Sequence, residues 1–244
     1  MKDAPERDAR FDDRLSSPRA DYRLSIREWL AGVDFDDRLL PLCFLVTGAA
    51  LVIHIVTPLP LWFTTPVTVV TGGLILWGLY RRGDADGERT AALIVIGLRS
   101  GIVALITYDL ARLGWVWATG ASVNPFDALP LFGAGLVGET APVWGRWTAG
   151  VLFHVANGLG FAIAFVLLFR ERANVWWGVA WGLALEVLVL ALYPAWLQLD
   201  AIRKFATMSV FGHVIYGGTL GATAKRQWDR LAEQPPKRLP SVGG

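Results

Sequence analysis

Residues 147–224 contain three apolar segments, which read WTAGVLFHVANGLGFAIAFVLLF (147–169), VWWGVAWGLALEVLVLALYPA (175–195) and FATMSVFGHVIYGGTLGATA (205–224). Each segment is long enough to cross a hydrocarbon core of about 30 Å as a helix that rises about 1.5 Å per residue. Each also has one ionisable residue in its interior, in turn His154, Glu186 and His213. Such a residue is costly in a membrane unless it is paired or faces a cavity, so it marks a candidate functional site. These segments predict a helical membrane module with a polar centre.

The whole chain is too apolar for an ordinary soluble domain. Of its 244 residues, 54% are hydrophobic and 18% are charged, and its mean hydropathy is +0.43. The charges are concentrated before residue 39, in the loop 81–90 and after residue 224. This distribution is typical of a multi-pass membrane protein. We therefore expect an all-α, polytopic membrane helical bundle whose first partner is the lipid bilayer.

The charged residues do not indicate a nucleic-acid partner. Acidic and basic residues alternate in the charged segments, and the formal net charge is only +2. The single cysteine, Cys43, excludes an intramolecular disulfide. A homo-oligomer or a membrane partner subunit is compatible with this composition.

Six transmembrane helices are predicted. They cover residues 39–57, 61–80, 91–113, 147–169, 175–195 and 205–224. The first two form an N-terminal hairpin, residues 39–80, because Pro58 and Pro60 force a reversal between them. The last four form a membrane module, residues 91–224. In the loop 118–146, predicted to be re-entrant or interfacial, we expect Pro130 to stop a short helix that Asn124 begins.

Lysine and arginine predict the orientation. They crowd the segments 1–38, 81–90, 170–172 and 225–244, whereas the opposite loops hold few. By the positive-inside rule both termini are cytoplasmic. Residues 1–38 are then a charged and partly disordered leader, in which residues 22–33 form either an amphipathic helix or a solvated linker. Residues 225–244 form a cytoplasmic tail.

Four titratable residues lie at similar depths in four different predicted spans. They are Asp109, His154, Glu186 and His213, about 6–13 Å from the outer ends of their helices at the usual helical rise. If the four helices form a bundle, these residues form one candidate polar or ion site. Asn157 and Tyr216 follow their histidines by three residues and share their helix faces, and Tyr108 precedes Asp109, so these three form a second layer.

Three interpretations of this centre stay open. Histidine and carboxyl groups suit a proton or cation relay, and proton- or cation-linked permeation or transport is the function we favour. A metal site would use His154, His213 and Glu186, with Asp109 as a further ligand, and would suit zinc, iron or manganese. In the third interpretation the polar groups only satisfy one another between packed helices. The protein is then a structural or accessory subunit that packs against a partner through its glycine-rich faces.

An enzyme is the least favoured class. The sequence has no phosphate-binding glycine loop, no Gly-x-Ser-x-Gly elbow and no cysteine pair. Ser209 precedes His213 by four residues, which permits a contact between hydroxyl and imidazole, but a Ser–His hydrolase needs more than that. We assign no catalytic residues and no cofactor, and a metal-dependent membrane enzyme is the only enzyme that the centre suggests.

Small residues and short patterns predict how the helices meet. Glycines spaced by four residues allow close backbone contact, and they occur at Gly97 and Gly101, at Gly178 and Gly182, and at Gly217 and Gly221. The pattern His-Val-x-x-Gly begins at both His154 and His213. Asp109 and Arg112, three residues apart, are expected to pair. Arg99 lies inside its span with no evident acidic partner.

Several motifs resemble a known family. They are Phe153-His154 with Phe161 and Phe165, Trp177-Gly178, Tyr193-Pro194, and Ser209-Val210-Phe211-Gly212-His213. On these motifs the stretch from about Leu93 to Arg230 resembles the YagU-like group of uncharacterised bacterial inner-membrane proteins. The resemblance implies a four-span module in a bacterial plasma membrane, to which this chain adds two spans and a leader. It carries His154 and His213 over as sites and implies no molecular activity.

Overall fold

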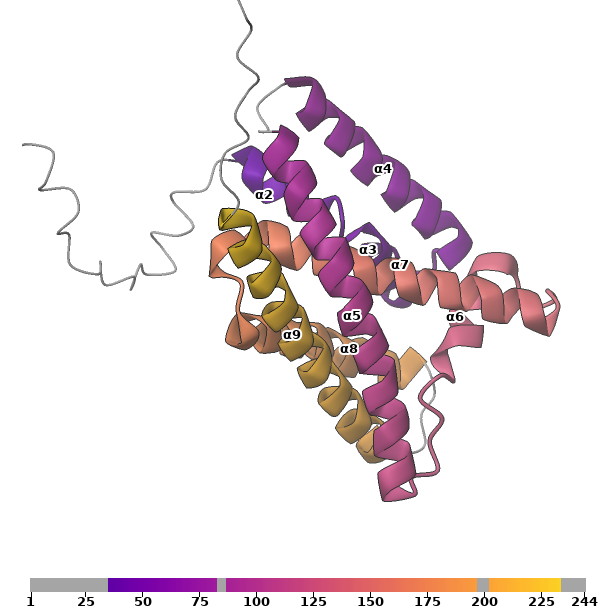
Figure 1. Cartoon of the computed structure of the whole chain (residues 1–244). Helices are drawn as coiled ribbons and strands as arrows, with labels where there is room; N and C mark the ends of the chain where they lie inside the picture. Colours follow the sequence, from indigo (N-terminus) through magenta and orange to yellow (C-terminus); the bar gives the residue numbers. More distant parts are fainter. Residues whose placement is uncertain (1–34, 83–86, 197–201, 234–244) are drawn as a thin grey trace, which may run out of the picture. The chain divides into compact units, whose positions relative to one another are not determined.

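The computed structural model describes residues 35–82, 87–196 and 202–233, which form helices and short connections (Figure 1). The helices are α2 (Phe35–Leu42), α3 (Val46–Val56), α4 (Leu61–Arg82), α5 (Gly87–Thr119), α6 (Ala128–Val137), α7 (Val143–Phe169), α8 (Val175–Trp196) and α9 (Ile202–Ala232), with a 3-10 turn at Arg170–Arg172. The all-α class is confirmed for this part of the chain. Residues 1–34, with the predicted amphipathic helix 22–33, and residues 234–244 lie outside the described residues.

Four of the described helices are long and apolar enough to cross a membrane, judged by length and composition. They are Leu61–Arg81, Arg89–Thr119, Val143–Arg172 and Val175–Leu192. They correspond to the second to fifth predicted spans. The sixth predicted span lies within α9, which is long enough but holds more small and polar residues. A membrane helical bundle is thus supported, while six spans with both termini in the cytoplasm remain a prediction.

The first predicted span is not one continuous helix. The segment 39–57 divides into the end of α2 and the 11-residue helix α3, with turns at Cys43–Leu45 between them. At the break the carbonyl oxygen of Phe44 meets α7, where a Cβ atom on Gly160 would lie only 2.3 Å away. At a rise of about 1.5 Å per residue, α3 is about half as long as the hydrocarbon core is thick. The expectation of a single 39–57 helix was therefore wrong.

Two other predicted boundaries also differ from the structure. Pro130 does not stop a helix, because it lies in the first turn of α6, where a missing N–H removes no intrahelical bond. Helix α6 therefore continues to Val137. Likewise, α9 runs on to Ala232, so the predicted tail 225–244 begins as helix.

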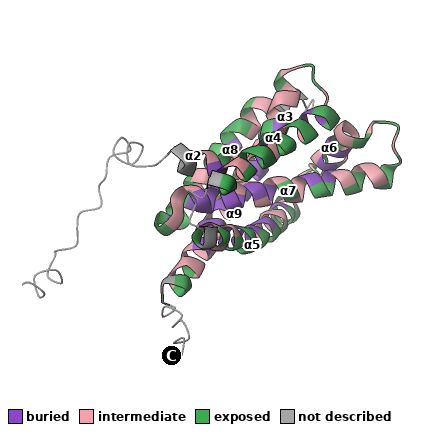
Figure 2. Ribbon diagram, turned by 90° about the horizontal axis from the view of Figure 1, so that it is seen from above, coloured by how far each residue is buried: buried purple, intermediate pink, exposed green. Residues whose placement is uncertain are grey.

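Helix α7 lies at the centre of the packing. It contacts α2, α3, α5, α6 and α8, and Figure 2 shows buried residues along it in the middle of the bundle. Its residues 162–167 are all buried. The helix that carries His154 is therefore held from several sides.

Close glycine contacts fix the register between α8 and α9. A Cβ atom added to Gly178 would lie 2.0 Å from the carbonyl oxygen of Gly217, and one added to Gly182 would lie 2.2 Å from that of His213. From one contact to the next, the chain advances four residues along α8 and goes back four along α9, so the helices are antiparallel. Because any side chain would separate these backbones, the predicted role of the glycines in helix contact is confirmed.

Helices α5 and α7 meet in a similar way. A Cβ atom added to Gly97 would lie 2.7 Å from Cα of Ile163, and one added to Gly158 would lie 2.8 Å from the Leu105 side chain. The contacts again run in opposite directions along the two helices. In both pairs the glycine of a His-Val-x-x-Gly pattern, Gly158 or Gly217, lies at the contact, one turn from its histidine.

Candidate functional site

Glu186 and His213 form a buried pair one turn beyond the glycine contacts of α8 and α9. Nδ1 of His213 lies 2.6 Å from Oε2 of Glu186, and the Ser209 hydroxyl donates a hydrogen bond of 2.7 Å to the same oxygen. The Glu186 side chain is only 2% exposed. Its other oxygen, Oε1, has no hydrogen-bond partner among the described residues. A buried carboxyl group with one oxygen unsatisfied is unusual in a protein interior, and a functional role is one reason for it.

The contacts of His213 determine which ring nitrogen carries its proton. Nδ1 also lies 3.0 Å from the main-chain carbonyl oxygen of Ser209, which can only accept a hydrogen bond. In the neutral ring Nδ1 is therefore the donor, and Nε2 carries the lone pair. Nε2 has no hydrogen bond to a described side chain, and His213 lines a cavity. His213 thus presents a proton acceptor to that cavity.

Asp109 and His154 form a second pair, between α5 and α7. Nε2 of His154 lies 3.3 Å from Oδ2 of Asp109. The other oxygen of Asp109 lies 3.5 Å from Nη1 of Arg112, so the predicted pairing of Asp109 with Arg112 is confirmed. Arg112 is 8% exposed, and its guanidinium lies over the rings of Tyr108 and Phe126 at 4.7 and 5.5 Å from their centroids. These contacts with aromatic rings stabilise the positive charge of the buried guanidinium.

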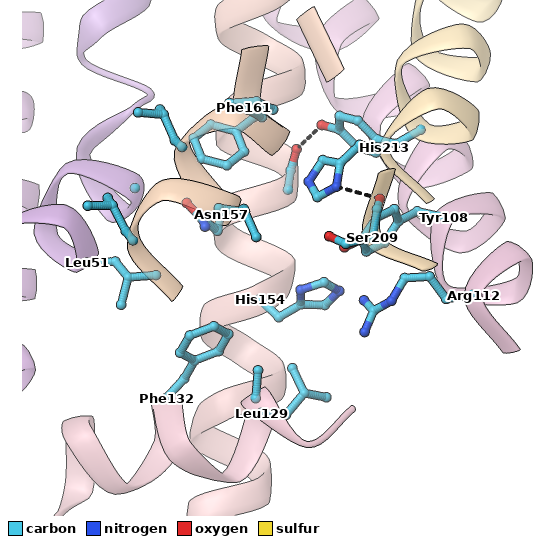
Figure 3. A pocket seen from close by; sticks show the side chains of 18 of the residues that line it. Leu51, Tyr108, Arg112, Leu129, Phe132, His154, Asn157, Phe161, Ser209 and His213 are labelled. Carbon is cyan, nitrogen blue, oxygen red and sulfur yellow. Dashed lines mark hydrogen bonds between the residues drawn. The ribbon is translucent and has the colours of Figure 1, made fainter. Parts of the chain in front are cut away.

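Tyr108 lies between the two pairs. Its ring centroid is 5.1 Å from that of His213 and 6.1 Å from that of His154. Figure 3 shows both histidines, Tyr108 and Arg112 around the same space. The four predicted site residues are therefore brought to one region, but as two carboxylate–imidazole pairs rather than as one cluster.

A cavity of about 740 Å³ adjoins this region. Most of its wall is apolar, with Leu51 of α3, Leu129 and Phe132 of α6, and Phe161 of α7 among the lining residues (Figure 3). Its polar lining residues include Tyr108, Arg112, Asn157, His154, Ser209, His213 and Tyr216. The carboxylates of Asp109 and Glu186 are not part of the lining. The two imidazoles thus contact the cavity, and each is backed by a carboxylate.

The predicted second layer lies at the cavity wall and joins helices. The hydroxyl of Tyr216 donates a hydrogen bond of 2.7 Å to the carbonyl oxygen of Gly158, which connects α9 to α7. The hydroxyl of Thr47 donates one of 3.0 Å to Oδ1 of Asn157, which connects α3 to α7. These bonds hold the polar wall of the cavity in place.

The interpretations based on a metal or on a partner subunit find less support. Within the described residues, no group of three His, Cys, Asp or Glu side chains is placed to hold a metal ion. His154 and His213 pair with different carboxylates. The glycine faces that we expected a partner subunit to use are covered by contacts within the chain itself.

Sequence reasoning missed two parts of the site. The spacing of Ser209 and His213 permits a contact between hydroxyl and imidazole, but in the structure the Ser209 hydroxyl bonds to Glu186 and the Ser209 carbonyl contacts His213. The spacing of Ser209 and His213 could not show this, because Glu186 comes from another helix. The cavity itself had no signal in the sequence, since its wall combines side chains from six helices.

This fold and site define a class of protein, a helical membrane bundle with a polar centre beside an apolar cavity. Comparison with models of protein families finds no match, and comparisons with characterised proteins and with solved structures find none either. The resemblance to the YagU-like group stays a prediction. The function must therefore be argued from the site.

Proposed function

We propose that the protein transports small amphipathic organic cations across a bacterial plasma membrane in exchange for protons. The cavity supports this proposal by its size and lining. Pockets for small organic molecules typically enclose about 300–1,000 Å³ and have mostly apolar walls with a few oriented polar groups. At about 740 Å³, with aromatic rings in its wall, the cavity has both properties.

The charge of the centre favours a cation over an anion. The centre contains two carboxylates, Asp109 and Glu186, and one guanidinium, that of Arg112, which pairs with Asp109. When both imidazoles are neutral, the centre therefore has a net negative charge. The aromatic side chains at the wall, including Tyr108, Phe132 and Tyr216, add ring faces that attract organic cations.

The observation that carries the proposal is the arrangement of His213. Its Nδ1 is held by a buried carboxylate while Nε2 is open toward the cavity. Protonation at Nε2 places a positive charge at the cavity wall. A second positive charge about 7 Å away then costs about 2 kcal/mol at an effective dielectric constant of about 20. A proton and an organic cation thus compete for the same site, as proton-linked exchange requires.

The topology belongs to the same proposal. With six spans and both termini in the cytoplasm, the polar centre lies in the outer half of the membrane. The structure then corresponds to the outward-facing state of the transporter. Such a transporter also needs an inward-facing arrangement of the same helices.

Uptake into proteoliposomes tests the proposal. Vesicles that contain the reconstituted protein are loaded at acidic pH and diluted into alkaline buffer with radiolabelled tetraphenylphosphonium, and a potassium ionophore clamps the potential. We expect the pH gradient to drive uptake at least about fivefold above protein-free vesicles. In His213→Asn the amide nitrogen can replace Nδ1 as donor, but no nitrogen titrates. We expect this variant to lose the response to pH.

His54 provides the matched control. Its Nδ1 contacts the carbonyl oxygen of Leu59 at 2.8 Å, and the side chain does not line the cavity. His54→Asn should transport as the unmodified protein does. Equal, pH-independent uptake by the unmodified protein and by His213→Asn would contradict proton-linked exchange.

A further inference from the structure

Three arginines line a cleft between α5 and α9 that is separate from the cavity of the polar centre. The cleft encloses about 710 Å³. Its lining comprises Ala91, Ala92, Val95, Ile96, Arg99 and Val103 of α5 with Thr223, Arg226, Gln227, Arg230 and Leu231 of α9. None of these residues lines the larger cavity. Arg99, for which the sequence suggested no partner, thus faces two further arginines.

A cross-helix hydrogen bond sets the level of the arginines. Nε2 of Gln227 donates a bond of 2.8 Å to the hydroxyl of Ser100, which is fully buried. Arg226 and Arg99 are the chain neighbours of these two residues, so they lie at the same height along the helices. Arg230 follows Arg226 by one turn and lies on the same face.

The positive charge of the cleft is not neutralised by the described residues around it. Among them, none forms an ion pair with Arg99, Arg226 or Arg230. The nearby carboxylate of Asp229 is bound by Lys225. Arg99 is also unusual in lying between apolar neighbours, and such a residue in a membrane helix requires a partner or a polar cavity. The three guanidinium groups are therefore available to bind an anion.

The apolar part of the cleft shows which kind of anion fits. Val95 and Val103 lie on either side of Arg99 in sequence, and they are 42% and 43% exposed. The exposed side chains of Ile102 and Ile106 extend this surface along α5, away from Arg230. A ligand with an anionic head and an apolar chain can contact both parts at once. A free anion would use only the arginines.

We propose that the cleft between α5 and α9 binds an anionic phospholipid, with its phosphate against Arg99 and Arg226 and an acyl chain along Val103 and Ile106. Guanidinium groups bind phosphate oxygens through paired, charge-assisted hydrogen bonds. Basic pockets between membrane helices on the cytoplasmic side bind lipid headgroups in this way. The predicted orientation places this end of α5 and α9 on the cytoplasmic side. The proposal does not depend on transport through the cavity.

Native mass spectrometry of the full-length protein in detergent tests this site. The protein is titrated with phosphatidylglycerol, with phosphatidylcholine of the same acyl chains, and with inorganic phosphate. We expect one molecule of phosphatidylglycerol to bind more tightly than phosphatidylcholine or inorganic phosphate does. In the double variant Arg99→Gln, Arg226→Gln the dissociation constant of this lipid should rise at least about tenfold, which corresponds to about 1.4 kcal/mol.

Control variants and control ligands separate binding in the cleft from nonspecific binding. Arg81→Gln with Arg172→Gln removes the same charge from exposed positions outside the cleft, and it should bind as the unmodified protein does. Arg230→Gln, at an exposed position of the cleft, should weaken binding by a smaller factor, and it provides a second test if the double variant does not fold. Equal binding of phosphatidylglycerol by the unmodified protein and both cleft variants overturns the proposal. So does equal affinity for phosphatidylcholine, or affinity for inorganic phosphate that matches that of the lipid.

Discussion

Replacing Gly182 by alanine should lower the free energy of unfolding by about 2 kcal/mol, within the range for an overpacked interior. The added Cβ atom would lie 2.2 Å from the carbonyl oxygen of His213, and that atom belongs to the backbone, which cannot rotate away as a flexible side chain can. Helices α8 and α9 must therefore move apart at this point. This separation would also break the 2.6 Å contact between Glu186 and His213, which lies one turn further along the helices.

Gly73 provides the matched control for this substitution. It lies in α4, and an added Cβ atom would have no neighbour within 4 Å. Gly73→Ala should be neutral or slightly stabilising, because alanine favours helix over glycine by about 1 kcal/mol. Unfolding of both variants is measured by titration with a denaturing detergent. If Gly182→Ala is as stable as Gly73→Ala, the close approach of α8 to α9 is wrong.

Removal of His213 should have the largest effect of any single substitution in the site. His213→Ala leaves the carboxylate of Glu186, 2% exposed, with only the Ser209 hydroxyl as partner. Removing one partner of a buried ion pair typically costs about 3–5 kcal/mol. We expect a loss of about 3 kcal/mol in the same unfolding assay.

A second substitution should recover most of this loss. Glu186→Gln removes the buried negative charge, and its amide oxygen can still accept the hydrogen bond from the Ser209 hydroxyl. The double variant Glu186→Gln, His213→Ala should therefore be more stable than His213→Ala alone, a non-additive result typical of residues in contact. Additive losses would show that the two side chains do not interact. In His54→Ala the lost contact of Nδ1 is with a main-chain carbonyl oxygen, and the substitution should cost about 1 kcal/mol or less.

The apolar pattern predicts most of the helices but not their interruptions. Residues 61–80, 147–169 and 175–195 are continuous apolar runs, and each lies within one helix. Residues 39–57 form a similar run, yet the helix breaks where the carbonyl of Phe44 approaches Gly160. That contact joins residues far apart in the sequence, so no local pattern can show it. At Pro130 the sequence predicted an interruption that the structure does not have, because a proline in the first helical turn is compatible with the helix that follows.

The candidate site could be predicted as a set of residues but not as an arrangement. Depth along the helices identifies Asp109, His154, Glu186 and His213, because each is an ionisable residue in an apolar span. Which carboxylate meets which imidazole depends on helix rotation and register. Glycine contacts set both, at Gly158 between α7 and α5 and at Gly217 between α9 and α8. The shared His-Val-x-x-Gly pattern is thus a sequence signal of this arrangement, although its meaning requires the partner helices.

The most direct test of the proposed exchange is the number of protons released when an organic cation binds. The detergent-solubilised protein is titrated with tetraphenylphosphonium in weakly buffered solution near neutral pH, and the released protons are measured with a pH indicator. Because a bound cation disfavours the protonated form of His213, the unmodified protein and His54→Asn should release up to one proton per bound cation, and His213→Asn should release none. Cation binding without proton release by the unmodified protein, in every buffer from weakly acidic to weakly alkaline, would contradict the account.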